Sequence, residues 1–202
     1  MPTETPNSKK RSNSSPQGRH GAGARPRRRR VPARKPGEQA RVEITAGGIV
    51  FQRRPDGPYV GFILDSHGKW SFAKGHVKMA KGETLEEAAV RETEEEMGLA
   101  GLKVVSKLGT TDIWFRDRFE HKGALVHKFI TYYLLEATSG SRGRPQKEEM
   151  IHKLDWVPLN RVHRVPIYPN TVGLLRKAVR IIRRELGGSR DDARDKKPPA
   201  QV

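Results

Sequence analysis

The chain has 202 residues and carries 40 Lys and Arg against 23 Asp and Glu, which gives a formal net charge of +17. This length predicts one domain with flanking tails rather than several domains. The absence of cysteine excludes disulfides and thiolate sites and fits a reducing, cytoplasmic environment. No apolar run is long enough to span a membrane, and the N-terminus lacks the apolar core of a secretory signal, so no membrane association is expected.

Residues 1–40 are rich in Pro, Gly, Ser and Arg and contain almost no large apolar side chain, which predicts a disordered basic N-terminal tail. Residues 1–41 hold 12 basic and 2 acidic residues, so most of the net charge lies there. The run from Arg25 to Arg30 indicates either a solvated tail or sequence-indifferent binding of RNA, ribosomes or another polyanion. The segment also loosely fits an organelle transit peptide, but it lacks the apolar stripe of an amphipathic helix.

After the tail, short apolar runs alternate with turn residues, in the pattern of a strand-rich domain that ends in a helix. We expect strands at 42–51, 59–64, 70–72, 102–115, 124–135 and 154–158, and a helix at 171–186 with Asn170 as its N-cap and Gly187-Gly188 as its end. Residues 124–135 are apolar on both faces, which is typical of a central strand. We therefore expect His127 to be satisfied within that strand, and residues 187–202 to form a disordered C-terminal tail.

The clearest local signal is a helix between Thr84 and Gly98. Thr84 is a good N-cap, and Glu87 three residues later completes a capping box. Gly98 is a natural stop at the other end. Leu85, together with Ala88, Ala89 and Met97, can form an apolar stripe that faces a core.

The other side of this predicted helix is unusually acidic. Glu92, Glu95 and Glu96 stand at i, i+3 and i+4, so their carboxylates converge on one face. Like charges this close repel one another, and nothing in helix stability favours the arrangement. A hard divalent cation such as Mg²⁺ (or Mn²⁺) would turn that repulsion into ligation, because it prefers oxygen ligands. The alternative is an ordinary solvated acidic face.

The stretch from Gly75 to Leu99 resembles the Nudix box: a glycine, a spacer, a glutamate, seven residues, and then Arg-Glu-(apolar)-x-Glu-Glu-x-Gly-(apolar). Glu83, seven residues and Arg91 to Leu99 match in order. Two departures stand out. Seven residues separate Gly75 from Glu83 where the family usually has five, and Thr93 occupies a position that is usually aliphatic.

The resemblance implies a fold of the α/β (α+β) class, a helix-sheet-helix sandwich with a mixed β-sheet, over residues 41–186. It also implies a metal-dependent hydrolase of phosphoanhydride bonds. Glu92, Glu96, Glu95 and Gly75 would be the metal ligands, with Mg²⁺ or Mn²⁺ as the cofactor. Glu95 would alternatively be the general base, Arg91 would hold the glutamates, and Glu83 would support the site. Some members use a base outside the box, and Glu120, Glu148 and Glu149 are candidates here.

The substrate is left open by the sequence. The segment 74–81 is rich in cations, and Lys74, His76, Lys78 and Lys81 are candidates for binding substrate phosphates. A phosphorylated small molecule, either a dinucleoside polyphosphate or a nucleoside triphosphate, is favoured. The alternatives are an RNA 5′ end, a diphosphoinositol polyphosphate, or a non-catalytic RNA- or ribosome-associated module. Base stacking would need aromatic side chains, for which Trp114, Phe115 and Phe119 are candidates.

Overall fold

The computed structural model describes residues 31–145 and 151–191, with side chains described up to residue 187. The expectations for residues 1–30 and 192–202, and for Glu148 and Glu149 as bases, fall outside the described residues. The chain divides into the units Met1–Arg30 and Val31–Val202, and the description below concerns the second unit.

A mixed β-sheet forms the centre of this unit. Along the sheet the strands lie in the order β3 (Trp70–Ser71), β2 (Gly57–Leu64), β1 (Arg41–Arg54), β6 (Leu125–Ala137) and β5 (Lys103–Arg116). β4 (Lys74–His76) pairs with β1, and β7 (Lys153–Pro158) pairs with β2. β1 runs parallel to β6, whereas β5 and β2 pair antiparallel with their neighbours. The predicted mixed sheet is therefore confirmed.

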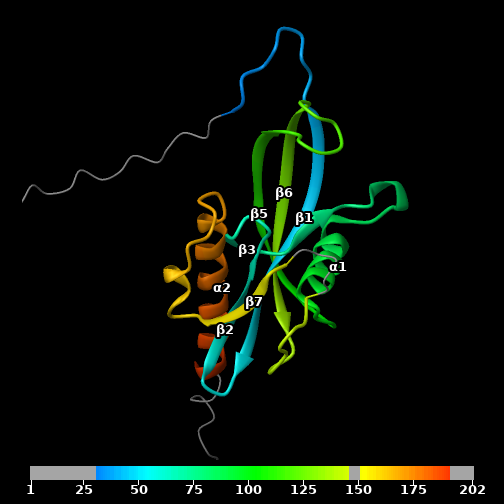
Figure 1. Cartoon of the computed structure of the whole chain (residues 1–202). Coiled ribbons are helices and arrows are strands. Elements are labelled where there is room, and N and C mark those ends of the chain that lie inside the picture. The colour runs from blue at the N-terminus through cyan, green and yellow to red at the C-terminus, as the bar shows by residue number, and fades with distance from the viewer. Residues whose placement is uncertain (1–30, 146–150, 192–202) are drawn as a thin grey trace, which may run out of the picture. The chain divides into compact units, whose positions relative to one another are not determined.

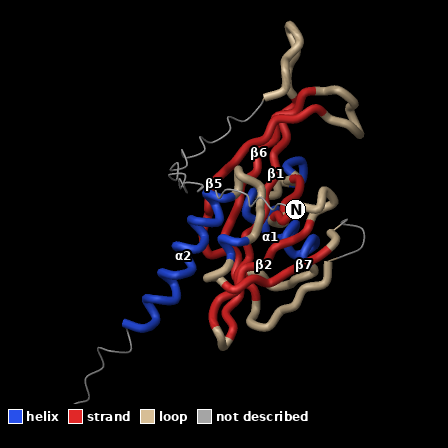
Figure 2. The backbone as a smooth tube through the Cα atoms, turned by 60° about the vertical axis from the view of Figure 1, so that its left-hand side comes forward, coloured by secondary structure: helices blue, strands red, loops and turns tan. Residues whose placement is uncertain are grey.

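Two helices cover the opposite faces of this sheet (Figures 1 and 2). α1 (Leu85–Met97) packs on one face and α2 (Val172–Asp191) on the other. Two short 3₁₀ turns, Met79–Lys81 and Val162–Arg164, precede them. The predicted helix-sheet-helix sandwich is thus confirmed. Among the described residues, no helix is both long and apolar enough to cross a membrane.

Alternation along the strands divides the core into two layers. Ile49, Phe51, Phe62, Tyr132 and Ile182 belong to the layer between the sheet and α2. The layer under α1 is built from smaller side chains and contains Ala46, Val50, Ala88, Ala89 and Leu135. Strand β6 is buried continuously from residue 130 to residue 135, as expected for a central strand. Burial on both faces fixes its register, because a slip of one residue would exchange the two layers.

The ends of α2 differ from the sequence-based expectation. The helix continues through Gly187-Gly188 to Asp191, so the glycines do not end it as predicted. A helical glycine costs only about 1 kcal/mol, which explains why two glycines need not stop a helix. At the other end Thr171 directly precedes the helix, and its carbonyl accepts from the Leu175 amide. Asn170 instead donates its side-chain amide to Thr111.

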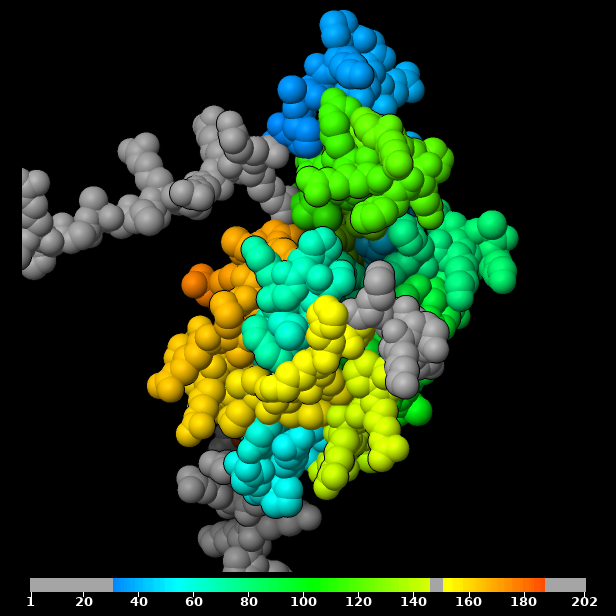
Figure 3. All heavy atoms as spheres, in the orientation of Figure 1, coloured from blue at the N-terminus to red at the C-terminus, as the bar shows by residue number. Residues whose placement is uncertain are grey.

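The described part of the predicted tail, residues 31–40, contacts the end of β5. Arg116 donates to both carboxylate oxygens of Glu38, at 2.6 and 2.9 Å, and to the carbonyl of Ala33. The Arg34 guanidinium lies 5.0 Å from the ring centroid of Trp114. In Figure 3 the blue atoms of this segment lie against the green atoms of the β5–β6 connection. These contacts join residues 31–40 to the end of β5.

Candidate active site

The site is built where β4 leads through a loop into α1. Gly75 on β4 pairs with Ala46 of the buried strand β1, which fixes the start of the loop against the sheet. Thr84 caps α1 with the predicted capping box: its hydroxyl accepts from the Glu87 amide, and the Glu87 carboxylate accepts from the Thr84 amide. Gly98 ends the helix with φ of 58°, a left-handed conformation that glycine adopts without strain.

The longer spacer before Glu83 contains the 3₁₀ turn Met79–Lys81, which closes at Gly82 with φ of 75°. This turn places the Glu83 carboxylate beside the start of the spacer, where it accepts a hydrogen bond from the Lys78 amide at 2.6 Å. The two additional residues therefore do not displace Glu83 from the helix that follows.

Arg91 is the centre of the polar network. Its Nε and one terminal nitrogen donate to the two oxygens of Glu83, at 2.6 and 3.0 Å. Its other terminal nitrogen donates to Glu92 at 2.6 Å and to Glu95 at 3.1 Å. A further bond reaches the carbonyl of His76, the last residue of β4, at 3.0 Å. One planar guanidinium thus joins three carboxylates to the loop, a task that suits the fixed fork of arginine donors.

The electrostatics of the network follow from this geometry. The Arg91 guanidinium, helped by the Lys78 amide, lowers the pKa of Glu83 to about 2. The same carboxylate raises the pKa of Arg91 further above its ordinary value, followed by a contribution from Glu92. Both partners are therefore charged at any physiological pH. Arg91 thereby offsets part of the repulsion among the glutamates that the sequence predicts.

The remaining box residues lie on the β4 side of α1. A Cβ added at Gly75 would overlap the carboxylate of Glu92, so only glycine permits this approach. One oxygen of Glu96 accepts from the Lys74 amide at 3.2 Å. Glu92 and Glu96 therefore both face the glycine-containing strand. Glu95 is more open, with 42% of its side chain exposed against 14% for Glu92.

The donor set suits a hard divalent cation, because it consists of carboxylates that approach a glycine backbone closely. Within 31–145 and 151–191, however, no three acidic or histidine side chains lie close enough to form a ready-made metal site. Arg91 and the backbone amides hold these carboxylates instead. Ion binding would therefore exchange part of the Arg91 contacts for cation–carboxylate contacts.

The cationic residues predicted to bind phosphate are distributed along this loop. His76, Lys78 and Lys81 are exposed, and Lys74 is half-buried. The His76 ring lies 3.3 Å from Glu43, which is also paired with Lys128 at 2.8 Å. The main-chain amides of Lys74 and Lys78 already support Glu96 and Glu83. The loop therefore combines backbone support for the glutamates with side chains that reach solvent.

Some structural roles were missed from the sequence. Thr93, at the usually aliphatic position, is fully buried and donates its hydroxyl to the Ala89 carbonyl one turn earlier, which satisfies its polar atom. The carboxylate of Glu94 accepts from the Leu102 amide after the helix. The contact between Glu94 and Leu102 could have been predicted only from knowing how the chain passes from α1 to β5. The pair of Glu43 and Lys128 joins strands that are far apart in the sequence.

The candidates outside the box have other surroundings. Trp114 stacks on His127 with ring centroids 3.8 Å apart, and Asp112 lies 3.0 Å from the same histidine, so His127 is satisfied within the sheet as predicted. Phe115 contacts the Lys128 ammonium, and Phe119 is 86% exposed on the β5–β6 connection. Glu120 is exposed on the β5–β6 connection, outside β4 and α1.

Comparison with known proteins places this arrangement in a family. A model of the NUDIX domain matches residues 39–177. A Mycobacterium tuberculosis protein (strain CDC 1551 / Oshkosh) that carries the name mutator protein MutT4 is 34% identical over an alignment of 128 positions, which covers 59% of this chain and 48% of that protein. The chain thus spans about half the length of this curated relative.

Solved structures show the same fold at low identity. A C. elegans Ap4A hydrolase in a binary complex has a TM-score of 0.54 at 20% identity, with 72% of this chain and 98% of that chain covered. The Nudix hydrolase RenU of M. smegmatis has a TM-score of 0.53 at 20% identity, with 79% and 90% covered. The domain match spans well over half of the chain and includes the complete Arg91 network, so this protein belongs to the Nudix family.

Proposed function

We propose that this protein hydrolyses a phosphoanhydride bond in a nucleotide-like polyphosphate with the help of a divalent metal ion. The observation that carries the proposal is the Arg91 network, which gathers Glu83, Glu92 and Glu95 beside the Gly75 strand. Such a concentration of carboxylates opposes helix stability, and its chemistry matches the oxygen-ligand preference of Mg²⁺ or Mn²⁺. Membership of the Nudix family supports the same reaction class.

In this proposal Glu92, Glu96 and Glu95 hold the metal, together with the carbonyl of Gly75. The bound ion would supply charge neutralisation of the phosphate oxygens and a lower pKa for its water ligand. The fit is supported by the Gly75 approach to Glu92 and by the position of Glu96 against the Lys74 amide.

The side chains of the chain carry out the remaining tasks. Arg91 orients the carboxylates, so we assign it as a positioning residue supported by Glu83. Glu95, whose side chain is 42% exposed against 14% for Glu92, would alternatively leave the metal and accept the proton from the attacking water. The segment from β4 to α1 would contact the phosphates of the substrate through its cationic side chains, which are Lys74, His76, Lys78 and Lys81. Their positive charge would offset the negative charge that develops in the reaction.

We favour a dinucleoside polyphosphate or a nucleoside triphosphate as the substrate. The cationic loop suits a substrate with several phosphates. The named relatives point the same way, since one carries the name of a mutator protein and one structural neighbour is an Ap4A hydrolase. An RNA 5′ end and a diphosphoinositol polyphosphate satisfy the same charge requirement and belong in the test.

The test is a substrate panel with Mg²⁺ or Mn²⁺: diadenosine tetraphosphate, nucleoside triphosphates, ADP-ribose, 5′-triphosphorylated RNA and a diphosphoinositol polyphosphate. We expect Glu96→Gln to abolish turnover while the circular dichroism spectrum is unchanged. Glu86→Gln removes the charge of an exposed glutamate on the same helix and should leave turnover intact. Full activity of Glu96→Gln with added metal would show that the assignment is wrong.

A further inference from the structure

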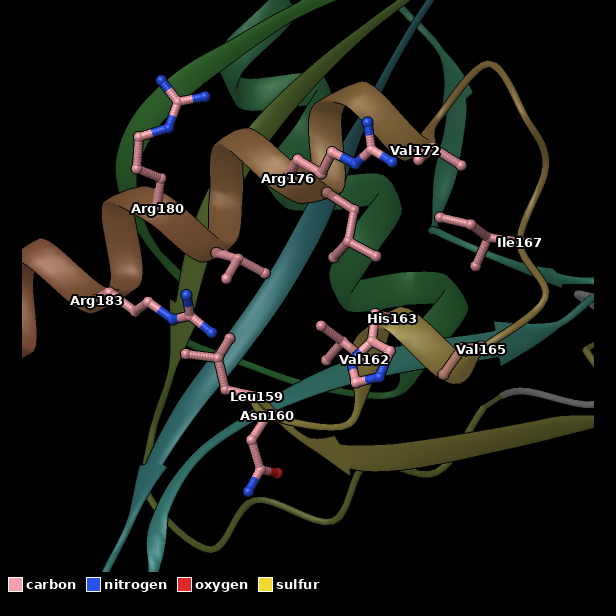
Figure 4. A pocket seen from close by; sticks show the side chains of 12 residues that line it. Leu159, Asn160, Val162, His163, Val165, Ile167, Val172, Arg176, Arg180 and Arg183 are labelled. Atoms are coloured by element: carbon pink, nitrogen blue, oxygen red, sulfur yellow. The ribbon is translucent and has the colours of Figure 1, made fainter. Parts of the chain in front are cut away.

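A second concave region lies on the opposite side of the sheet from α1. It is a groove of about 500 Å³ between α2 and the segment 159–167 (Figure 4). Its floor is aliphatic and contains Leu159, Val162, Val165, Ile167, Leu175 and Val179. Since α1 and α2 cover opposite faces of the sheet, the groove is separate from the candidate active site.

The rim of this groove carries a row of arginines. Arg176, Arg180 and Arg183 line it from α2, at positions i, i+4 and i+7, so they follow one side of the helix. All three are exposed, and they form no hydrogen bond or ion pair with any residue that the structure describes. In Figure 4 the Arg176 and Arg183 side chains lie along the helix beside the groove, whereas the Arg180 side chain extends away from Leu159 and Val162. Like charges at these spacings destabilise a helix, so the stability of α2 does not explain why three arginines stand there.

The groove is elongated. A neighbouring hollow shares Leu159 and Arg183 and continues to Leu186 and Pro58. Along α2 the concave surface therefore runs from Val172 to Leu186, which corresponds to about 21 Å at the helical rise per residue. Within the part of the chain that the structure describes, no acidic residue lines the main groove. Asp56 lines only a smaller hollow at one end, where it accepts a hydrogen bond from Tyr59.

These features define the chemistry of an occupant. Among the described residues, no Phe, Tyr or Trp lines the main groove, and the small ring of His163 is its one aromatic group, so a platform for stacking nucleic-acid bases is not formed there. Several guanidinium groups along the length of the groove match several carboxylates at helical spacing better than a single anionic head group. An aliphatic floor matches leucine-like anchors on one face of a helix. We propose that this groove binds an acidic amphipathic helix of a partner protein.

The test uses the full-length protein and a fluorescent synthetic helical peptide with leucines at i, i+3, i+4 and i+7 and glutamates at the flanking positions. A second peptide has serine in place of every leucine and keeps the same charge. Fluorescence anisotropy should show the leucine peptide binding roughly tenfold or more tightly, because burying each leucine contributes to affinity. Equal affinity of the two peptides would overturn the proposal, since it would reduce the interaction to charge alone.

The variant with Arg176→Glu, Arg180→Glu and Arg183→Glu should lose binding of the leucine peptide. A matched variant with Arg118→Glu, Arg142→Glu and Arg144→Glu has the same change in net charge at exposed sites elsewhere and should keep it. Circular dichroism and nucleotide hydrolysis report folding in both. Equal loss in the two variants contradicts the proposal. So does displacement of the peptide by myristate, which indicates a lipid site, or by single-stranded RNA, which indicates a nucleic-acid site.

Discussion

Arg91 is the residue on which the geometry of the site depends most. It bonds to three carboxylates and a carbonyl, and only a forked donor can satisfy them together. We expect Arg91→Lys to lower kcat roughly 10- to 100-fold, the usual cost of removing a residue that orients metal ligands. Arg184→Lys, at an exposed position on α2, is the control. Wild-type kcat together with an unchanged metal dependence in Arg91→Lys would argue against a positioning role.

Glu83 gives the network a defined dependence on pH. Its pKa is lowered from 4.5 to about 2, so its ion pair with Arg91 contributes fully to stability above pH 4.5 and is lost as the pH falls toward 2. The wild type should therefore lose its advantage in unfolding free energy over Glu83→Gln across that window. Urea unfolding of both proteins at several pH values between 2 and 7 measures the difference. A constant difference throughout would mean that the ionised carboxylate contributes nothing.

At the scale of elements, the capping box of α1 links helix stability to the site. Thr84→Ala removes the hydroxyl that accepts from the Glu87 amide, and it should lower the free energy of unfolding by about 1 kcal/mol. Thr138→Ala, at an exposed threonine outside any helix, should change it by less than about 0.5 kcal/mol. Chemical denaturation of the two variants provides the comparison, and equal effects would exclude a capping contribution.

The elements with local signals were predictable from the sequence, and those that depend on distant contacts were not. Thr84, Glu87 and Gly98 define α1 because caps act within a few residues. β4 escaped prediction because three residues carry no periodic pattern, and its pairing with β1 requires the tertiary fold. The continuation of α2 through Gly187 was also not predicted, because tertiary context overrides the weak helix-breaking preference of glycine.

The same distinction applies to the site. The spacing of Glu92, Glu95 and Glu96 on one helix face follows from helical geometry alone. The bond from Arg91 to the His76 carbonyl and the approach of Gly75 to Glu92 depend on how the loop folds back. Sequence spacing did not indicate that a 3₁₀ turn would contain the longer spacer.

At the scale of the whole molecule, positive charge is concentrated before residue 31. Residues 1–30 contain nine basic residues and one acidic residue. We propose that this segment binds RNA or another polyanion independently of catalysis. A truncation for testing this must begin after Arg30, because Glu38 and Ala33 contact Arg116.

Removal of residues 1–30 should leave hydrolysis of a small nucleotide unchanged and abolish salt-sensitive RNA binding, because the phosphate contacts that release counterions are lost. Replacing only the five arginines between residues 25 and 30 with serine provides a finer variant. Filter binding at several salt concentrations and a hydrolysis assay measure the two activities separately. Loss of catalysis on truncation would instead make the segment part of the active site.

The parallel pairing of β1 with β6 has a consequence for how the chain folds. Every β1 residue from Arg41 to Gln52 pairs with a residue 85 positions later, up to Ala137. During synthesis β1 can form a hairpin with β2, but its other edge stays unpaired until most of the domain has been made. Such distant pairing slows folding. Fragments that stop before Leu125, and so lack β6, should therefore aggregate, since the edge of their earliest strand remains available to other chains.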